Sequence, residues 1–143
     1  MCKCASAHFV NFTHTPSLIK FEGILIWQDF MFACAVYPTN GDYLTNVHSE
    51  IVYQLDRLRH HACIMVWAGN NENEALIATN WYGTDSDKTL YTDDYRQLYV
   101  NTIREIVTNG DASRPFLTSS PTNGLQTQKE NWVASNPWAL FYL

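Results

Sequence analysis

The sequence predicts an α/β fold with parallel strands, because short apolar runs alternate with segments of helical periodicity along its 143 residues. Three runs, at 23–27, 62–67 and 113–118, are rich in β-branched or aromatic residues and are too short for helices. Helical patterns separate them. This β-α-β-α-β order favours parallel strands joined by right-handed crossovers, and the chain is long enough for one domain with a modest core.

The first predicted strand, 23–27, ends at two polar residues, Gln28 and Asp29. The residues before it, 1–22, show no clean periodicity, and we expect an irregular lead-in there. Segment 30–36 is apolar, and 37–42 (Tyr-Pro-Thr-Asn-Gly-Asp) has the chemistry of a turn. The pattern therefore places the carboxylate of Asp29 at the end of a buried strand.

A helix is predicted after this turn, because apolar residues recur at steps of three and four on one side. They are Leu44, Val47, Ile51, Leu55 and Leu58. Asp42 is the expected N-cap, and cationic side chains crowd the last turn, where they suit the helix dipole. His60 and His61 are better explained as helix-end residues than as a metal pair, because adjacent helical residues point in different directions.

The second predicted strand, 62–67, is followed at once by amides and carboxylates, Gly69-Asn70-Asn71-Glu72-Asn73-Glu74. In α/β sheets, reactive groups lie just beyond the carboxyl ends of the strands. The chemistry of the chain is therefore expected here. Glu72 is the first candidate for a catalytic acid, and Glu74 is the weaker one.

The remaining elements follow from similar signals. The sequence predicts a short helix within 74–82, a polar turn over 83–92, and a helix from Asp93 that stops at Asn109-Gly110. The third strand, 113–118, leads into Ser-Ser-Pro-Thr-Asn-Gly at 119–124. The sequence is then polar as far as Pro137 and ends in an apolar tail.

Composition excludes several classes of function. The net charge of −5 argues against a surface for polyanions, so nucleic acid is not an expected partner. No apolar span is long enough to cross a bilayer, and 1–20 lacks the apolar centre of a secretory signal. No metal or other cofactor is expected: Cys2 and Cys4 have no obvious partner ligands, and Cys34 and Cys63 are interpreted as small buried hydrophobes.

Three segments resemble the animal β-mannosidases of glycoside hydrolase family 2. They are Gly-Ile-Leu-Ile-Trp-Gln-Asp-Phe-Met-Phe-Ala-Cys-Ala at 23–35 with Tyr37-Pro38, Trp-Ala-Gly-Asn-Asn-Glu-Asn-Glu at 67–74, and Ser-Arg-Pro-Phe at 113–116 with 119–124. The resemblance divides the chain into a non-matching lead-in (1–22), a partial catalytic domain (23–137) and a non-matching tail (138–143).

This resemblance implies a retaining glycosidase that removes terminal non-reducing β-D-mannose. It also implies a partial TIM (β/α)₈ barrel, holding roughly strands three to five with their helices. In such enzymes an Asn precedes the acid/base Glu, so Glu72 is identified as the acid/base and Asn71 as its supporting residue. By the same resemblance, Asp29 would bind mannose hydroxyls, and Trp27 and Trp81 would shape the sugar subsite.

The resemblance further implies a β-mannoside oligosaccharide from N-glycan breakdown as substrate and a lysosomal setting. The family's nucleophile lies in a Ser-Glu-Tyr-Gly-like segment that this sequence does not contain. We therefore expect a truncated product or gene-model fragment that is inactive alone. Two alternatives stay open: a non-catalytic sugar-binding or interaction module that uses Asp29, Trp27 and Trp81, and a piece that neither folds independently nor has a function.

Overall fold

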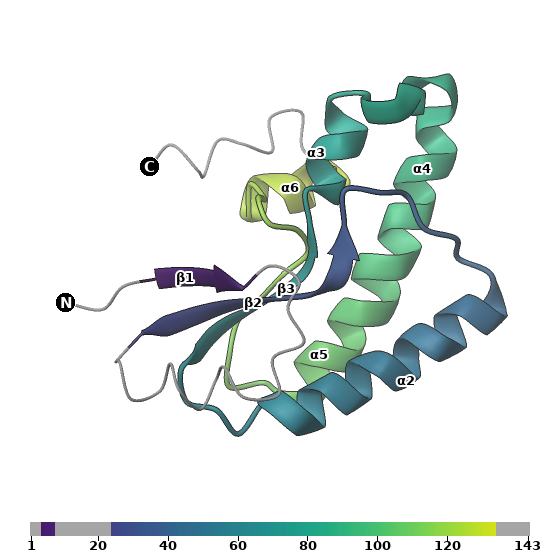
Figure 1. Cartoon of the computed structure of the whole chain (residues 1–143). Coiled ribbons are helices and arrows are strands. Elements are labelled where there is room, and N and C mark those ends of the chain that lie inside the picture. Colours follow the sequence, from purple (N-terminus) through teal and green to yellow (C-terminus); the bar gives the residue numbers. More distant parts are fainter. Residues whose placement is uncertain (1–3, 8–23, 134–143) are drawn as a thin grey trace.

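The computed structural model describes residues 4–7 and 24–133, which form a parallel sheet with helices packed on it (Figure 1). The sheet order is β1-β2-β3-β4, and each neighbouring pair is parallel. The strands are β1 (Cys4–Ala7), β2 (Leu25–Ala33), β3 (Ile64–Asn71) and β4 (Phe116–Leu117). The predicted α/β class and the parallel strands are confirmed.

Strand β1 lies within the segment 1–22 that was predicted to be irregular, so that prediction is wrong for Cys4–Ala7. This strand pairs with Leu25–Gln28 of β2, and its sequence Cys-Ala-Ser-Ala carries no local signal for a strand. It forms because the edge of β2 offers backbone partners. The proposed boundaries at 22/23 and 137/138 and the tail 138–143 lie outside the described residues.

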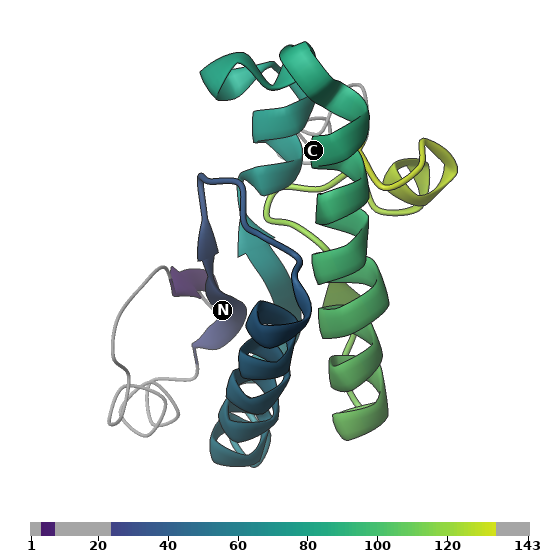
Figure 2. The same ribbon diagram turned by 90° about the vertical axis from the view of Figure 1, so that its right-hand side faces the viewer.

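Two helical units pack side by side on the sheet (Figure 2). One is α2 (Gly41–Leu58). The other is a continuous rod made of α4 (Lys88–Tyr95), the π-helical segment η2 (Arg96–Arg104) and α5 (Glu105–Gly110). Figure 2 shows α2 and the rod side by side, and α2 contacts both η2 and α5. The predicted apolar stripe of α2 is confirmed, since Val47, Ile51, Leu55 and Leu58 are all buried.

The helix starts differ from those predicted. Asn40, not Asp42, caps α2, and its side-chain oxygen accepts from the amide of Tyr43 at 3.0 Å. The rod begins at Lys88 rather than Asp93, because the side chain of Asp87 caps it by accepting from the amide of Leu90 at 3.2 Å. The first turns of α4 are largely exposed, so no apolar stripe marked them in the sequence.

The short elements frame the carboxyl edge of the sheet. They are α3 (Asn73–Ala78), the 3-10 segment η1 (Trp81–Asp87) and α6 (Leu125–Lys129), which lies where only a polar segment was predicted. Strands β2 and β3 both run further than predicted. Asp29 is therefore not at the end of its strand but in the middle of β2, where it pairs with Ala68. Among the described residues, no helix is both long and apolar enough to cross a bilayer.

A buried ionic cluster joins β3 to the segment before β4. Asp111 accepts from the indole N–H of Trp67 at 3.0 Å and forms a 2.5 Å ion pair with Arg114. Arg114 also donates to the carbonyls of Ile64 and His61, which fixes the beginning of β3. Burial alone would raise the pKa of Asp111, but hydrogen bonds from Ser113, Trp67 and Arg114 outweigh it and lower that pKa from 3.8 to about 2.

We predict that Asp111→Asn lowers the free energy of unfolding by about 2 kcal/mol at pH 7, measured by urea denaturation. The pKa of Asp111 is lower in the folded chain, so its contribution is complete above about pH 3.8 and is lost as the pH falls through about 2. The wild-type and variant stabilities should therefore converge toward pH 2.

Asp56→Asn is the matched control, because Asp56 pairs with Arg59 at a site where both side chains are at least half exposed. That substitution should cost less than about 1 kcal/mol and show no convergence at acid pH. An Asp111→Asn effect that is independent of pH would contradict the account of this cluster.

Candidate active site

The end of β3 is held from both sides at the carboxyl edge of the sheet. The amide of Cys34, just after β2, donates to the carbonyl of Asn71 at 2.9 Å. On the other side, the amide of Glu72 donates to the carbonyl of Ser120 at 2.9 Å, and Asn71 and Ser120 form a parallel bridge. Asn71 and Glu72 thus lie between the ends of their two neighbours, as expected for a reactive edge of an α/β sheet.

Glu72 occupies the turn between β3 and α3 with a left-handed backbone (φ 65°) and is half-buried. Its Oε2 atom accepts from the thiol of Cys34 at 3.0 Å, and the side-chain amide of Asn71 lies 3.7 Å from the same sulfur. Burial, together with the hydrogen bond and negative charge of Glu72, raises the pKa of the Cys34 thiol. The side chains of Glu72 and Asn71, which were predicted to act together, therefore both contact the sulfur of Cys34.

Cys34 is a residue whose place sequence reasoning missed. It was interpreted as a small buried hydrophobe, but it is only half-buried and its thiol contacts a carboxylate. Cys63 is buried, as predicted. Its position in the sequence could have indicated this contact, because Cys34 directly follows β2 and Glu72 directly follows the neighbouring strand β3.

Glu74 has a different environment from Glu72. Its side chain is fully buried, and its Oε1 atom accepts from the hydroxyl of Thr127 in α6 at 2.8 Å. Burial, followed by the nearby charge of Glu74, raises the pKa of Tyr95 in the rod. Glu74 is thus enclosed between α3, the rod and α6, whereas Glu72 stays in contact with solvent.

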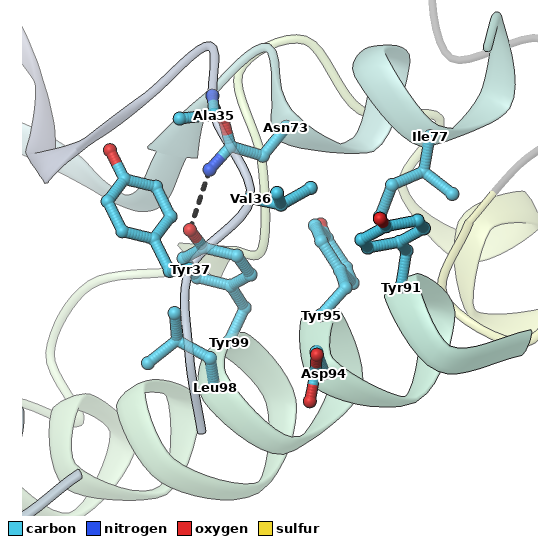
Figure 3. A pocket seen from close by; sticks show the side chains of 10 residues that line it. All are labelled: Ala35, Val36, Tyr37, Asn73, Ile77, Tyr91, Asp94, Tyr95, Leu98 and Tyr99. Carbon is cyan, nitrogen blue, oxygen red and sulfur yellow. Dashed lines mark hydrogen bonds between the residues drawn. The ribbon is translucent and has the colours of Figure 1, made fainter. Parts of the chain in front are cut away.

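Two buried asparagines fix the turn that carries Glu72. The amide of Asn70 donates to the carbonyl of Thr118 at 2.7 Å, while its oxygen accepts from the amide of Asn73 and the hydroxyl of Ser119. Asn73 accepts from the amide of Ala35 at 3.2 Å and donates to the hydroxyl of Tyr99 at 2.6 Å (Figure 3). The turn is therefore tied to the segment after β4, to the segment after β2 and to the rod.

The cleft drawn in Figure 3 lies beside this turn, between the segment after β2 and the rod. Aromatic rings of Tyr91, Tyr95 and Tyr99 fill most of it, and the remaining space is about 10 Å³. That is about the space of one water molecule, which is too small for a sugar ring. Burial raises the pKa of Tyr99 as well. This cleft is therefore a small gap in the packing behind the turn and not a sugar-binding site.

Trp27 and Asp29 form a second polar pair on β2. The indole N–H of Trp27 donates to Oδ1 of Asp29 at 3.2 Å, with Trp27 half-buried and Asp29 only 8% exposed. Because Asp29 pairs with Ala68, three residues before Asn71, it lies roughly 10 Å before that residue along the sheet. Trp81 lies beyond the far end of α3 and packs, partly buried, against the hydrophobic core.

No family model matches the chain, but it is similar to several β-mannosidases. The chain is 49% identical to mouse β-mannosidase and 52% identical to the bovine protein, each over 121 residues and 84% of this chain. The fold is similar to a solved β-D-mannosidase from Dictyoglomus thermophilum, with a TM-score of 0.74 and 30% identity; the match covers 85% of this chain and 15% of that one.

A match over 121 of the 143 residues must include the middle of the chain, and therefore the segment 67–74 that carries the candidate site. The chain spans 14% of the length of both mammalian relatives. This chain is therefore a homologue of the β-mannosidases, to which it is similar along one segment of their length.

Proposed function

We propose that this chain carries the acid/base half of a β-mannosidase site, with Glu72 as the general acid/base. One observation carries the proposal: Glu72 is a half-exposed carboxylate at the carboxyl edge of a parallel sheet, directly after Asn71, in a segment shared with β-mannosidases. We further infer that β2, β3 and β4 correspond to strands three to five of a TIM barrel of glycoside hydrolase family 2.

The chemistry assigned to Glu72 is proton transfer. As the glycosidic bond breaks, the leaving sugar oxygen must gain a proton, and the same carboxylate later removes a proton from the water that completes hydrolysis. Asn71 would hydrogen-bond the sugar 2-hydroxyl. Asp29 would bind mannose hydroxyls from deeper along β2, with Trp27 beside it. Trp81 would also shape the subsite, although it lies at the opposite end of α3 from Glu72.

Retention of configuration needs a second carboxylate about 5–5.5 Å from the first. Glu74 does not suit that role, because its carboxylate is buried against Thr127. The nucleophile is instead assigned to the Ser-Glu-Tyr-Gly-like segment, which this sequence does not contain. The proposed substrates are terminal β-D-mannosides such as the oligosaccharides of N-glycan breakdown, in a lysosomal setting.

A chimaera tests the assignment of Glu72. We expect mouse β-mannosidase whose matching segment is replaced by 24–133 of this chain to hydrolyse a chromogenic β-mannoside, while the isolated chain shows no turnover. Glu72→Gln in the chimaera should lower kcat/KM about 10²–10⁴-fold for a poor leaving group and far less for 2,4-dinitrophenolate, which needs no proton.

Glu105→Gln is the control, because Glu105 is an exposed carboxylate at the start of α5. It should leave both substrates unaffected. Equal losses for good and poor leaving groups would refute the acid/base role. Turnover by the isolated chain that Glu72→Ala abolishes would instead reveal a substitute nucleophile within it.

A non-catalytic sugar-binding module is the second candidate, favoured by the Trp27–Asp29 pair. This pairing joins an aromatic plane to a hydrogen-bonding carboxylate, the combination that sugar sites use. If the isolated chain binds sugar, titration with mannose should change its tryptophan fluorescence in a saturable way, and Asp29→Asn should weaken that change. No saturable response would count against this candidate.

A further inference from the structure

Two non-glycine residues with left-handed backbones face each other at the candidate site. Cys34 has φ 47° and Glu72 has φ 65°, and each lies just beyond the end of one of two adjacent strands. Side-chain-bearing residues rarely adopt this conformation, and it persists only where the surroundings impose it. The contacts around these two turns must therefore hold both residues in the left-handed conformation.

The surrounding contacts identify what imposes the conformation. Cys34 is held by its amide, which donates to Asn71, and the next residue, Ala35, donates to the oxygen of the buried Asn73. Glu72 is held by its own amide, which donates to Ser120. With both backbones fixed, the side chains converge, and Sγ of Cys34 lies 3.0 Å from Oε2 of Glu72.

We propose that Cys34 is a positioning residue for Glu72. Its thiol donates a hydrogen bond to Oε2, which fixes the plane of the carboxyl group and leaves Oε1 to exchange a proton with the glycosidic oxygen. Asn71 constrains the sulfur from the strand side, since its amide approaches that atom at 3.7 Å. This inference rests on the proposed acid/base role of Glu72.

The chemistry of the thiol suits a donor rather than a nucleophile. A thiolate beside Glu72 would be repelled by the carboxylate, and burial with the neighbouring negative charge raises the pKa of Cys34. The thiol therefore keeps its proton at neutral pH and can donate it in a hydrogen bond.

Alkylation of the full chain tests the contact without requiring turnover. Cys34 carboxamidomethylation by iodoacetamide is followed by peptide mass spectrometry from pH 6 to 10, in the wild-type chain and in Glu72→Gln. Loss of the carboxylate should make the thiol ionise at lower pH, so Cys34 should react about three to ten times faster at pH 8. Glu105→Gln should leave the profile unchanged.

Cys63 supplies an internal reference, because it is buried in the core. It should react slowly in every variant. Superimposable Cys34 profiles for the wild type and Glu72→Gln would overturn the proposal. A Cys63 that reacts at the rate of an unfolded peptide would overturn it as well, since the contact would then not exist in the chain.

A second readout follows Glu72 itself. The side-chain carboxyl ¹³C resonance of Glu72 at pH 7 should shift in Cys34→Ala, which removes the donor, and return toward the wild-type position in Cys34→Ser, which restores one. Identical resonances in the wild type and Cys34→Ala would overturn the positioning role. A confirmed contact combined with an inactive chimaera would instead refute the proposed function alone.

Discussion

The buried side-chain amide of Asn70 is the interaction on which the candidate site depends. It joins the end of β3 to the segment after β4 through Thr118 and Ser119, and it accepts from the amide that begins α3. An unsatisfied amide here would cost more than the hydrogen bonds contribute, so these partners must form together. The turn that presents Glu72 is thus a consequence of satisfying one buried residue.

This constraint divides the polar residues of the motif into two groups. Asn70, Asn73 and Glu74 turn inward and form hydrogen bonds with the segment after β4, the rod and α6. Asn71 and Glu72 stay half-exposed at the edge. In an extended strand Glu72 and Glu74 would share one face, but the left-handed backbone of Glu72 ends the strand and directs the two carboxylates apart.

The sequence predicted what depends on local pattern. Apolar runs located β2 and β3, because a strand that is covered on both faces is apolar throughout. The three-four spacing located α2, because a helix that is buried on one side carries an apolar stripe. The longer extent of β3 was not readable, since Asn70 is buried by partners about 48 residues away. The start of the rod at Lys88, the strand β1 and the contact of Cys34 with Glu72 were missed for the same reason. Each depends on a distant partner or a cap rather than on periodicity.

Carboxylate labelling of the isolated chain tests most directly whether Glu72 is accessible to solvent while Glu74 is buried. Carbodiimide coupling to glycine ethyl ester, read by peptide mass spectrometry, should modify Glu72 readily and Glu74 only after denaturation. Equal labelling of Glu72 and Glu74 under native conditions would contradict the account, because it would mean that the turn does not separate an accessible acid from a buried one.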